Sequence, residues 1–199
     1  MKIGSWKKNK SKKKYGKGFV SSNFFRIFAT ENNKRVLTTK TKEIMSTRSC
    51  IIVKVRKEDL AKKMKFDASK VKLEDWGEQK KDEFSEEVEL KSPYVGVYCH
   101  WDGYPEGVGS VLKKCFNDYV SALNLVLGGF ISYLEDDKVV KHYANRSGED
   151  WKFIKPLQGK DCDSISKKVD HQYCYLFTEE KGWRVRGWKA NGDDTFDEF

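Results

Sequence analysis

Positive charge is concentrated at one end of this sequence, and that separation limits which part of the chain can fold. Residues 1–45 contain 13 Lys and Arg but only 2 Asp and Glu, whereas the rest of the chain contains 26 basic and 28 acidic side chains. A run of like charges repels itself and buries little apolar surface, so we expect residues 1–44 to form a flexible, partly disordered basic arm. Residues 45–192 are then predicted to form a single domain, followed by an acidic tail over 193–199.

Two segments of the predicted domain have strand patterns. Residues 50–56 are rich in β-branched side chains, and residues 94–101 alternate in character from one residue to the next. Both are predicted to be strands, because alternate side chains of a strand point to opposite faces. In the second strand Tyr98 and His100 would face away from the core, and the predicted core set is Val95, Val97, Cys99 and Trp101.

A pair of helices is predicted in the middle of the domain. Pro105 suits the first turn of one helix, and Asp118 begins a second over residues 118–127, which Gly128-Gly129 would end. The apolar face of this pair recurs at Val108, Leu112, Cys115, Phe116 and Tyr119.

Further strands are predicted on the far side of this helical pair. They cover residues 138–143, 171–178 and 183–189, and the last two would form a hairpin. Because the strands flank the helices and do not alternate with them, we predict an α+β fold with a largely antiparallel sheet and a central helical pair.

Residues 57–90 interrupt these patterns. They are highly charged and show little apolar periodicity. We therefore expect a charged insertion on the surface, with helical patches near 58–64 and 80–88.

Several classes of protein are disfavoured. No apolar run approaches the roughly 20 residues that a transmembrane helix needs, and the first residues lack the apolar core of a secretory signal. The five cysteines are scattered, so we expect an intracellular, reducing setting without disulfides or a cysteine-bound zinc ion. The three histidines are not at metal-ligand spacing, and the P-loop, dinucleotide, zincin and hydrolase motifs are missing. No metal and no cofactor is predicted.

The most unusual string covers residues 99–109 (CHWDGYPEGVG), at the predicted junction of a strand and a helix. On extended backbone His100 and Asp102 would share one face. Helix entry after Pro105 would leave backbone N–H groups free for a ligand, although Glu106 in the first turn would compete with an anion. The alternative is a tight turn whose polar side chains bond only locally.

Two further polar segments, residues 46–49 and 143–151, could complete a binding site with this string. Arg48 and its neighbouring hydroxyls could hold a phosphate or carboxylate, or they could simply anchor the strand that follows. Arg146 and Glu149 could line a pocket or pair with each other. The predicted ligand-binding residues are Thr47, Arg48, Ser49, Tyr98, His100, Trp101, Asp102, Tyr104, Glu106, Arg146 and Glu149.

The basic arm suggests contact with nucleic acid. Lysines neutralise phosphates and release counterions, while Trp6 and Tyr15 could stack on bases. A solubilising tail is the alternative, and membrane binding is disfavoured because no apolar stripe accompanies the lysines. The predicted nucleic-acid-binding residues are Lys7, Lys8, Lys10, Lys12, Lys13, Lys14 and Lys17.

Three blocks of the sequence resemble a family of small proteins from bacteriophages and mobile elements. They are MSTRS before an apolar strand, YCHWDGYP, and GEDW, and the resemblance covers about residues 45–190. Family members usually begin near the position of Met45, so the resemblance implies that residues 1–44 are an added arm and residues 57–90 an insertion. It also implies a viral accessory role in the host cytoplasm, by binding host machinery or countering host defence, and it names no reaction.

The leading hypothesis is a non-catalytic viral accessory protein that binds nucleic acid or a nucleotide. An alternative is an enzyme acting on a phosphate-containing substrate, with His100 as acid or base. In that version Asp102 or Glu149 would orient His100, and Arg48 or Arg146 would stabilise charge. A third possibility is binding to a host protein through aromatic anchors, with Tyr94, Tyr98, Trp183 and Trp188 as candidates.

Overall fold

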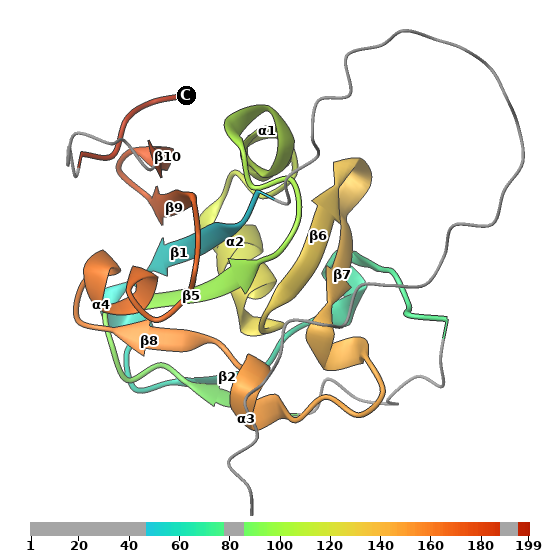
Figure 1. The fold of residues 1–199 in the computed structure, drawn as a ribbon. Helices are drawn as coiled ribbons and strands as arrows, with labels where there is room; N and C mark the ends of the chain where they lie inside the picture. The colour runs from blue at the N-terminus through green and yellow to red at the C-terminus, as the bar shows by residue number, and fades with distance from the viewer. Residues whose placement is uncertain (1–46, 78–85, 188–194) are drawn as a thin grey trace, which may run out of the picture. The chain divides into compact units, whose positions relative to one another are not determined.

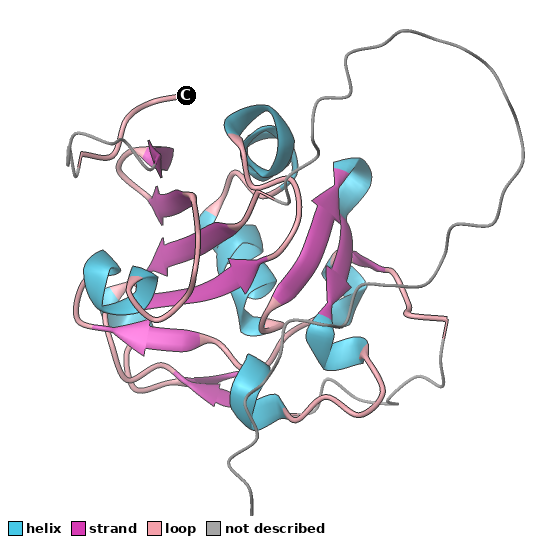
Figure 2. Cartoon of the chain, viewed as in Figure 1, coloured by secondary structure: helices cyan, strands magenta, loops and turns pink. Residues whose placement is uncertain are grey.

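The computed structural model describes residues 47–77, 86–187 and 195–199, and a β-sheet forms the centre of this domain (Figure 1). Its strands are β1 (Ser49–Lys54), β3 (Lys72–Leu73), β5 (Tyr94–Cys99), β6 (Ile131–Glu135), β7 (Val139–His142), β8 (Leu157–Gly159), β9 (Tyr173–Thr178) and β10 (Gly182–Gly187). They lie in the order β10-β9-β1-β5-β6-β7-β3, and β8 pairs with β5 outside that row. Figure 2 shows these strands in the middle of the domain, with short helices around them.

The sheet is mixed. The predicted strands over 50–56 and 94–101 are confirmed as β1 and β5, which pair antiparallel with Ser49 opposite Cys99. The predicted hairpin is confirmed as β9 and β10. The largely antiparallel sheet is wrong, however, because β1 pairs parallel with β9, β5 with β6, and β3 with β7. Each parallel pair joins strands separated by a long connection, which leaves the returning strand free to run in either direction.

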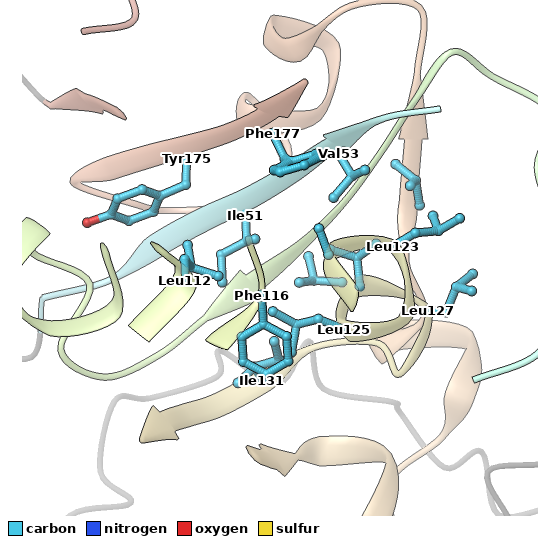
Figure 3. Close-up of a cluster of buried hydrophobic side chains, with 14 of the residues drawn as sticks. Ile51, Val53, Leu112, Phe116, Leu123, Leu125, Leu127, Ile131, Tyr175 and Phe177 are labelled. Atoms are coloured by element: carbon cyan, nitrogen blue, oxygen red, sulfur yellow. The ribbon is translucent and has the colours of Figure 1, made fainter. Parts of the chain in front are cut away.

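Helices α1 (Ser110–Cys115) and α2 (Tyr119–Leu127) cover one face of the sheet. Asp118 caps α2 by accepting a hydrogen bond from the backbone N–H of Ser121 (2.9 Å), and Gly129 follows the helix with a φ of 80°. Glycine adopts this left-handed conformation without strain, so both predicted ends of the helix are confirmed. Figure 3 shows the side chains packed between helices and sheet, among them Ile51, Val53, Leu112, Phe116, Leu123, Leu125, Leu127, Ile131, Tyr175 and Phe177.

The opposite face of the sheet is covered by α4 (Cys162–Ser166). Asp161 starts this helix with a capping box, in which its side chain and that of Ser164 each bond the other residue's backbone N–H. Ile165 is fully buried and packs in one cluster with Cys50, Ile52 and Cys174. Near the end of β5 on this same face, Tyr98 remains partly exposed.

Residues 57–90 are more than the surface insertion predicted from the sequence. Phe66, Val88 and Leu90 are buried in the core, and β3 belongs to the main sheet beside β7. Of the helical patch predicted near 58–64 only a short 3-10 helix over 57–59 is present, and 86–88, the described part of the other predicted patch, is not helical. The short elements observed are η1 (Lys57–Asp59), η2 (Ala68–Lys70), and the paired strands β2 (Lys63–Met64) and β4 (Val88–Glu89).

The remaining short elements are η3 (Pro105–Gly109), η4 (Asp136–Lys138), η5 (Tyr143–Asn145) and α3 (Trp151–Ile154). The basic arm and the first residues of the acidic tail lie outside the described residues. In the described part of the chain, no helix is both long enough and apolar enough to cross a bilayer.

Candidate ligand-binding site

A hollow of about 370 Å³ opens where the end of β5 meets two loops of the second half of the chain. We call it the aromatic hollow, because three aromatic rings and three charged side chains line it. Its lining residues are Tyr98, Phe130, Tyr143, Glu149, Ile154, Lys168, Val169 and Asp170. The volume falls within the range of small-molecule sites, roughly 300–1,000 Å³.

Tyr98 reaches the hollow because of the alternation along β5. Val97 and Cys99 on either side of it are fully buried on the α1/α2 face, so Tyr98 points to the opposite face. Its ring lies 5.8 Å from that of Phe130 (centroid to centroid). The predicted division of this strand between two faces is therefore confirmed for these residues.

The hydroxyl of Tyr98 lies 2.6 Å from Nδ1 of His100. Burial raises the pKa of Tyr98 to about 12, so this phenol keeps its proton near pH 7 and shares a hydrogen bond with the imidazole. Burial, together with the nearby Arg48, holds the pKa of His100 below its usual value. The pair is therefore neutral near pH 7, and the tautomer of His100 decides which of the two groups donates.

Arg48 precedes β1 and lies beside the same wall. Its guanidinium forms an ion pair with Asp170, which lines the hollow, and its backbone N–H donates to Oε1 of Gln172 at 2.6 Å. The side chain of Arg48 is 37% exposed, but its Nε is buried and has no hydrogen-bond partner among the described residues. A buried donor without an acceptor is unfavourable, so Arg48 would gain from an additional acceptor.

The loop after β7 supplies Tyr143 and Glu149. Nη1 of Arg146 lies 3.5 Å from Oε1 of Glu149, so the predicted pairing of these two residues is confirmed. The guanidinium of Arg146 also stacks over Trp76, 5.0 Å from the ring centroid. Burial raises the pKa of Tyr143, which keeps this phenol neutral as well. Of the three polar segments singled out in the sequence, only 143–151 supplies lining residues of the hollow. Arg48 and His100 from the other two segments instead contact the lining residues Asp170 and Tyr98.

Other predicted ligand-binding residues lie outside the lining of the hollow. The extended backbone that would align His100 with Asp102 ends at Cys99, and Asp102 has a left-handed φ of 55°. That expectation is therefore wrong. Trp101, predicted to be in the core, is only partly buried, and Ser49 is fully buried. Thr47, Tyr104 and Glu106 are likewise not part of the lining.

The glycine-rich turn is used for packing. The N–H groups of Gly107 and Gly109 both donate to the carbonyl of Tyr104, at 3.0 and 3.4 Å, so neither is free for a ligand. A Cβ at Gly107 would lie 2.3 Å from the carbonyl oxygen of Asp102. The close approach that glycine permits here is therefore between two parts of the chain itself.

Six lining residues were not among the predicted ligand-binding residues, namely Phe130, Tyr143, Ile154, Lys168, Val169 and Asp170, although Tyr143 belongs to the predicted segment 143–151. Ile154 is the last residue of the short helix α3, Tyr143 is the first of η5, and the others lie outside the helices and strands, so no periodicity identifies them. Trp183 was also proposed, from the sequence, as an exposed aromatic anchor for a host protein. Trp183 is buried and its Nε1 donates to the carbonyl of Phe116 at 2.8 Å, so that expectation is wrong, while Trp188 lies outside the described residues.

The aromatic hollow combines flat apolar surface with hydrogen-bond acceptors and cations. Tyr98, Phe130 and Tyr143 offer rings, Glu149 and Asp170 offer carboxylates, and Arg48 and Lys168 supply positive charge. Within the described ranges, no group of three His, Cys, Asp or Glu residues could hold a metal ion. No protein-family model, curated protein or solved structure matches this chain.

Proposed function

We propose that the aromatic hollow binds the base of a nucleotide or of single-stranded nucleic acid. The observation that carries this proposal is the convergence of three aromatic rings with Glu149 and Asp170 at one opening, where Asp170 is ion-paired with Arg48. Every nucleobase has a flat π face that stacks on aromatic side chains, and its edge carries hydrogen-bonding groups. We propose that such a binder acts as a viral accessory factor, as the resemblance of three sequence blocks to bacteriophage proteins implies.

The rings and the rim would contact different parts of the ligand. A base stacked on Tyr98 or Tyr143 would place its amino groups near the carboxylates of Glu149 and Asp170, which accept hydrogen bonds. A phosphate would compete with Asp170 for the guanidinium of Arg48, whose fork of donors suits both partners. Lys168, whose Nζ donates to the carbonyl of Gln158 at 3.1 Å, adds positive charge nearby.

Replacing Tyr98 or Tyr143 with leucine should weaken binding of a fluorescein-labelled single-stranded oligonucleotide about tenfold or more. Base stacking on an aromatic ring contributes about 1–3 kcal/mol, and leucine keeps bulk without the flat ring. Fluorescence anisotropy measures the dissociation constants, and nucleoside monophosphates serve as unlabelled competitors. Tyr104→Leu is the matched control, because Tyr104 is exposed and lies outside the hollow.

Equal affinities for all three variants, with unchanged circular dichroism, would refute the proposal. A loss confined to Tyr104→Leu would move the site to the turn before α1. Competition by nucleoside monophosphates would identify the free nucleotide as sufficient, whereas competition by oligonucleotides alone would identify the nucleic-acid strand.

We propose further that the seven lysines of the arm contact phosphates. The arm lies outside the described residues, so this part rests on charge alone. Replacing Lys7, Lys8, Lys10, Lys12, Lys13, Lys14 and Lys17 with glutamine should flatten the dependence of log K on log salt by up to about 5, since each phosphate contact contributes about 0.7 for a single strand. The same seven positions changed to arginine should keep the slope. An equal slope for the unmodified chain, the glutamine variant and the arginine variant would exclude the arm as a source of phosphate contacts.

The enzyme alternative has less support from the geometry. Nδ1 of His100 is bonded to a neutral phenol, and Glu149 is paired with Arg146. A general base of this kind is usually oriented by a carboxylate. We therefore favour a binding role for His100, in which it fixes the orientation of the Tyr98 hydroxyl at the hollow.

A further inference from the structure

Strand β10 is an outer strand of the sheet, and residues 195–199 of the same chain lie along the edge of β10 that does not pair with β9. The backbone N–H of Val185 donates to the carbonyl of Asp197 at 2.9 Å, and the N–H of Asp197 donates back to Val185 at 2.8 Å. This reciprocal pair is the unit of an antiparallel ladder. The last residues of the predicted acidic tail are therefore paired with the sheet.

Side chains of this segment alternate between the two faces of the sheet. Phe196 packs with the α4-side cluster, where the guanidinium of Arg186 lies 4.8 Å from its ring centroid. Phe199 packs on the α1 side against Tyr175, with ring centroids 5.5 Å apart. The Nζ of Lys113 lies 4.2 Å from the ring of Phe199. Each aromatic ring thus packs at its own place on the sheet, which we call its slot, and lies beside its own cation.

A further basic side chain, that of Arg184, contacts both the backbone of the segment and its acidic residue Glu198. Nε of Arg184 donates to the carbonyl of Phe196 at 3.0 Å, and Nη1 of Arg184 lies 3.3 Å from Oε1 of Glu198. The edge therefore offers backbone hydrogen bonds, three cations and two aromatic slots to a strand of alternating character. These are the elements of peptide recognition by strand addition.

The segment does not fill the space available. A hollow of about 600 Å³ lies beside Phe199 and Glu198, lined also by Lys113, Lys181 and Trp183. Like the surroundings of Phe196 and Phe199, this hollow combines positive charge, from Lys113 and Lys181, with an aromatic side chain, Trp183. The segment is held by the two reciprocal bonds at Val185, by the contacts of Arg184 and by the packing of its two rings. A partner that takes its place must therefore supply equivalent contacts.

We propose that the edge of β10 is a docking site for an extended segment of a partner protein that carries acidic and aromatic residues, and that residues 195–199 occupy it in the partner's absence. The complementarity of Arg184, Arg186 and Lys113 to the Phe-Asp-Glu-Phe sequence supports this occupant. A tethered segment competes at a high effective concentration, so it sets the affinity that a partner must exceed. This site is separate from the aromatic hollow and stands independently of the proposed function.

The test uses the full chain with its own segment disabled, either by Phe196→Ser with Phe199→Ser or by Asp197→Pro. Proline at 197 cannot donate to Val185, and Asp197 is exposed, so this second variant keeps the domain intact. The probe is a synthetic peptide of residues 195–199, titrated while the backbone amide signals of Val185 and Arg184 are followed by nuclear magnetic resonance.

In both variants we expect saturable shifts of these two amides, and at least tenfold weaker binding to the unmodified chain. A peptide with both phenylalanines changed to serine should not bind, and Arg184→Gln should weaken binding of the intact peptide. Folded variants whose Val185 signal does not respond would overturn the proposal. A dimer of the unmodified chain that disappears in the Phe196→Ser, Phe199→Ser variant would identify a second copy as the occupant and overturn the assignment to a separate partner.

Discussion

Acidification from pH 7 to pH 4 should reduce the free energy of unfolding by about 3 kcal/mol through one residue, His142. Burial lowers the pKa of His142 to about 4, whereas an exposed histidine has a pKa near 6.5. Between these values the unfolded chain binds a proton that the folded domain does not. The contribution of His142 to stability is therefore fully present above about pH 6.5 and is lost as the pH falls toward 4. Each pKa unit between the folded and the unfolded state corresponds to about 1.36 kcal/mol, which gives the total of about 3 kcal/mol.

The surroundings of His142 explain why it remains neutral. The side chain is fully buried at the end of β7, and its Nδ1 lies 3.1 Å from the carbonyl oxygen of Gly129. The ring packs edge-on against Phe66 at 5.1 Å, and a Cβ at Gly128 would lie 2.5 Å from it. Residue 128 must therefore be glycine for this packing. Because the ring is enclosed, its protonated form would lose its hydration, and this cost keeps the imidazole neutral.

Urea unfolding at several pH values between 4 and 7.5 measures this dependence. The pKa of His100 is also lowered, so the informative quantity is the difference in slope between the unmodified chain and His142→Gln. The variant should be less stable at pH 7.5 but should lose less stability on acidification. Identical pH profiles for the two proteins would contradict the assignment to His142.

Gly103→Ala should destabilise the domain by about 3 kcal/mol and abolish binding at the aromatic hollow. A Cβ at this position would lie 2.7 Å from the carbonyl carbon of Arg48 and 2.9 Å from Cβ of Ser49. Neither group is the flexible end of a side chain, so the backbone of the turn or of β1 must move. Overpacking of this kind typically costs about 1–3 kcal/mol, and backbone contacts lie at the upper end.

The effect on binding follows from what Gly103 joins. Its N–H donates to the carbonyl of Thr47 at 2.8 Å, and its carbonyl accepts from the hydroxyl of Tyr175 at 2.9 Å. Displacing this turn moves Arg48 away from Asp170 and from the rim of the hollow. Thermal unfolding and fluorescence anisotropy measure the two effects separately.

Gly187→Ala is the matched control for this prediction. A Cβ there would meet only the ring of Tyr173, at 3.3 Å, and the side chain can yield. We expect its stability to change by less than about 1 kcal/mol. A Gly103→Ala protein as stable and as active in binding as Gly187→Ala would contradict the account of the turn.

The sequence could predict those elements whose pattern is local. The residues of β5 alternate in character along the sequence, and α2 has both an N-cap aspartate and a glycine after its end. The β9–β10 hairpin is joined by a short turn at Lys181-Gly182. In each case the residues that determine the element lie within one segment, so propensity and capping are sufficient.

Pairing between distant segments could not be read in this way. The parallel pair β1–β9 joins residues more than 100 positions apart, and nothing in either strand specifies the direction of its neighbour. Strand β6 was missed because its pairing with β7 shifts register between Ile131 and Tyr133, which breaks the alternation. In residues 57–90 the few apolar side chains are irregularly spaced, although Phe66 and Leu90 are buried.

The candidate site was predicted in its residue types more than in its arrangement. Tyr98 and Glu149 do line one opening, and Arg48 and His100 contact residues of its lining. Asp102, with a left-handed φ of 55°, is not part of the lining. Asp170 pairs with Arg48 across 122 positions of sequence, which no spacing rule identifies. The site is therefore a product of the tertiary fold.

Photo-crosslinking tests the central claim most directly. A single-stranded RNA carrying 4-thiouridine, irradiated with the full chain and analysed by peptide mass spectrometry, reports which side chains lie against a base. We expect adducts on Tyr98, Phe130 or Tyr143, which an excess of unlabelled strand removes. Adducts found only in residues 1–18, or only on surfaces away from the aromatic hollow, would show that the bases bind elsewhere.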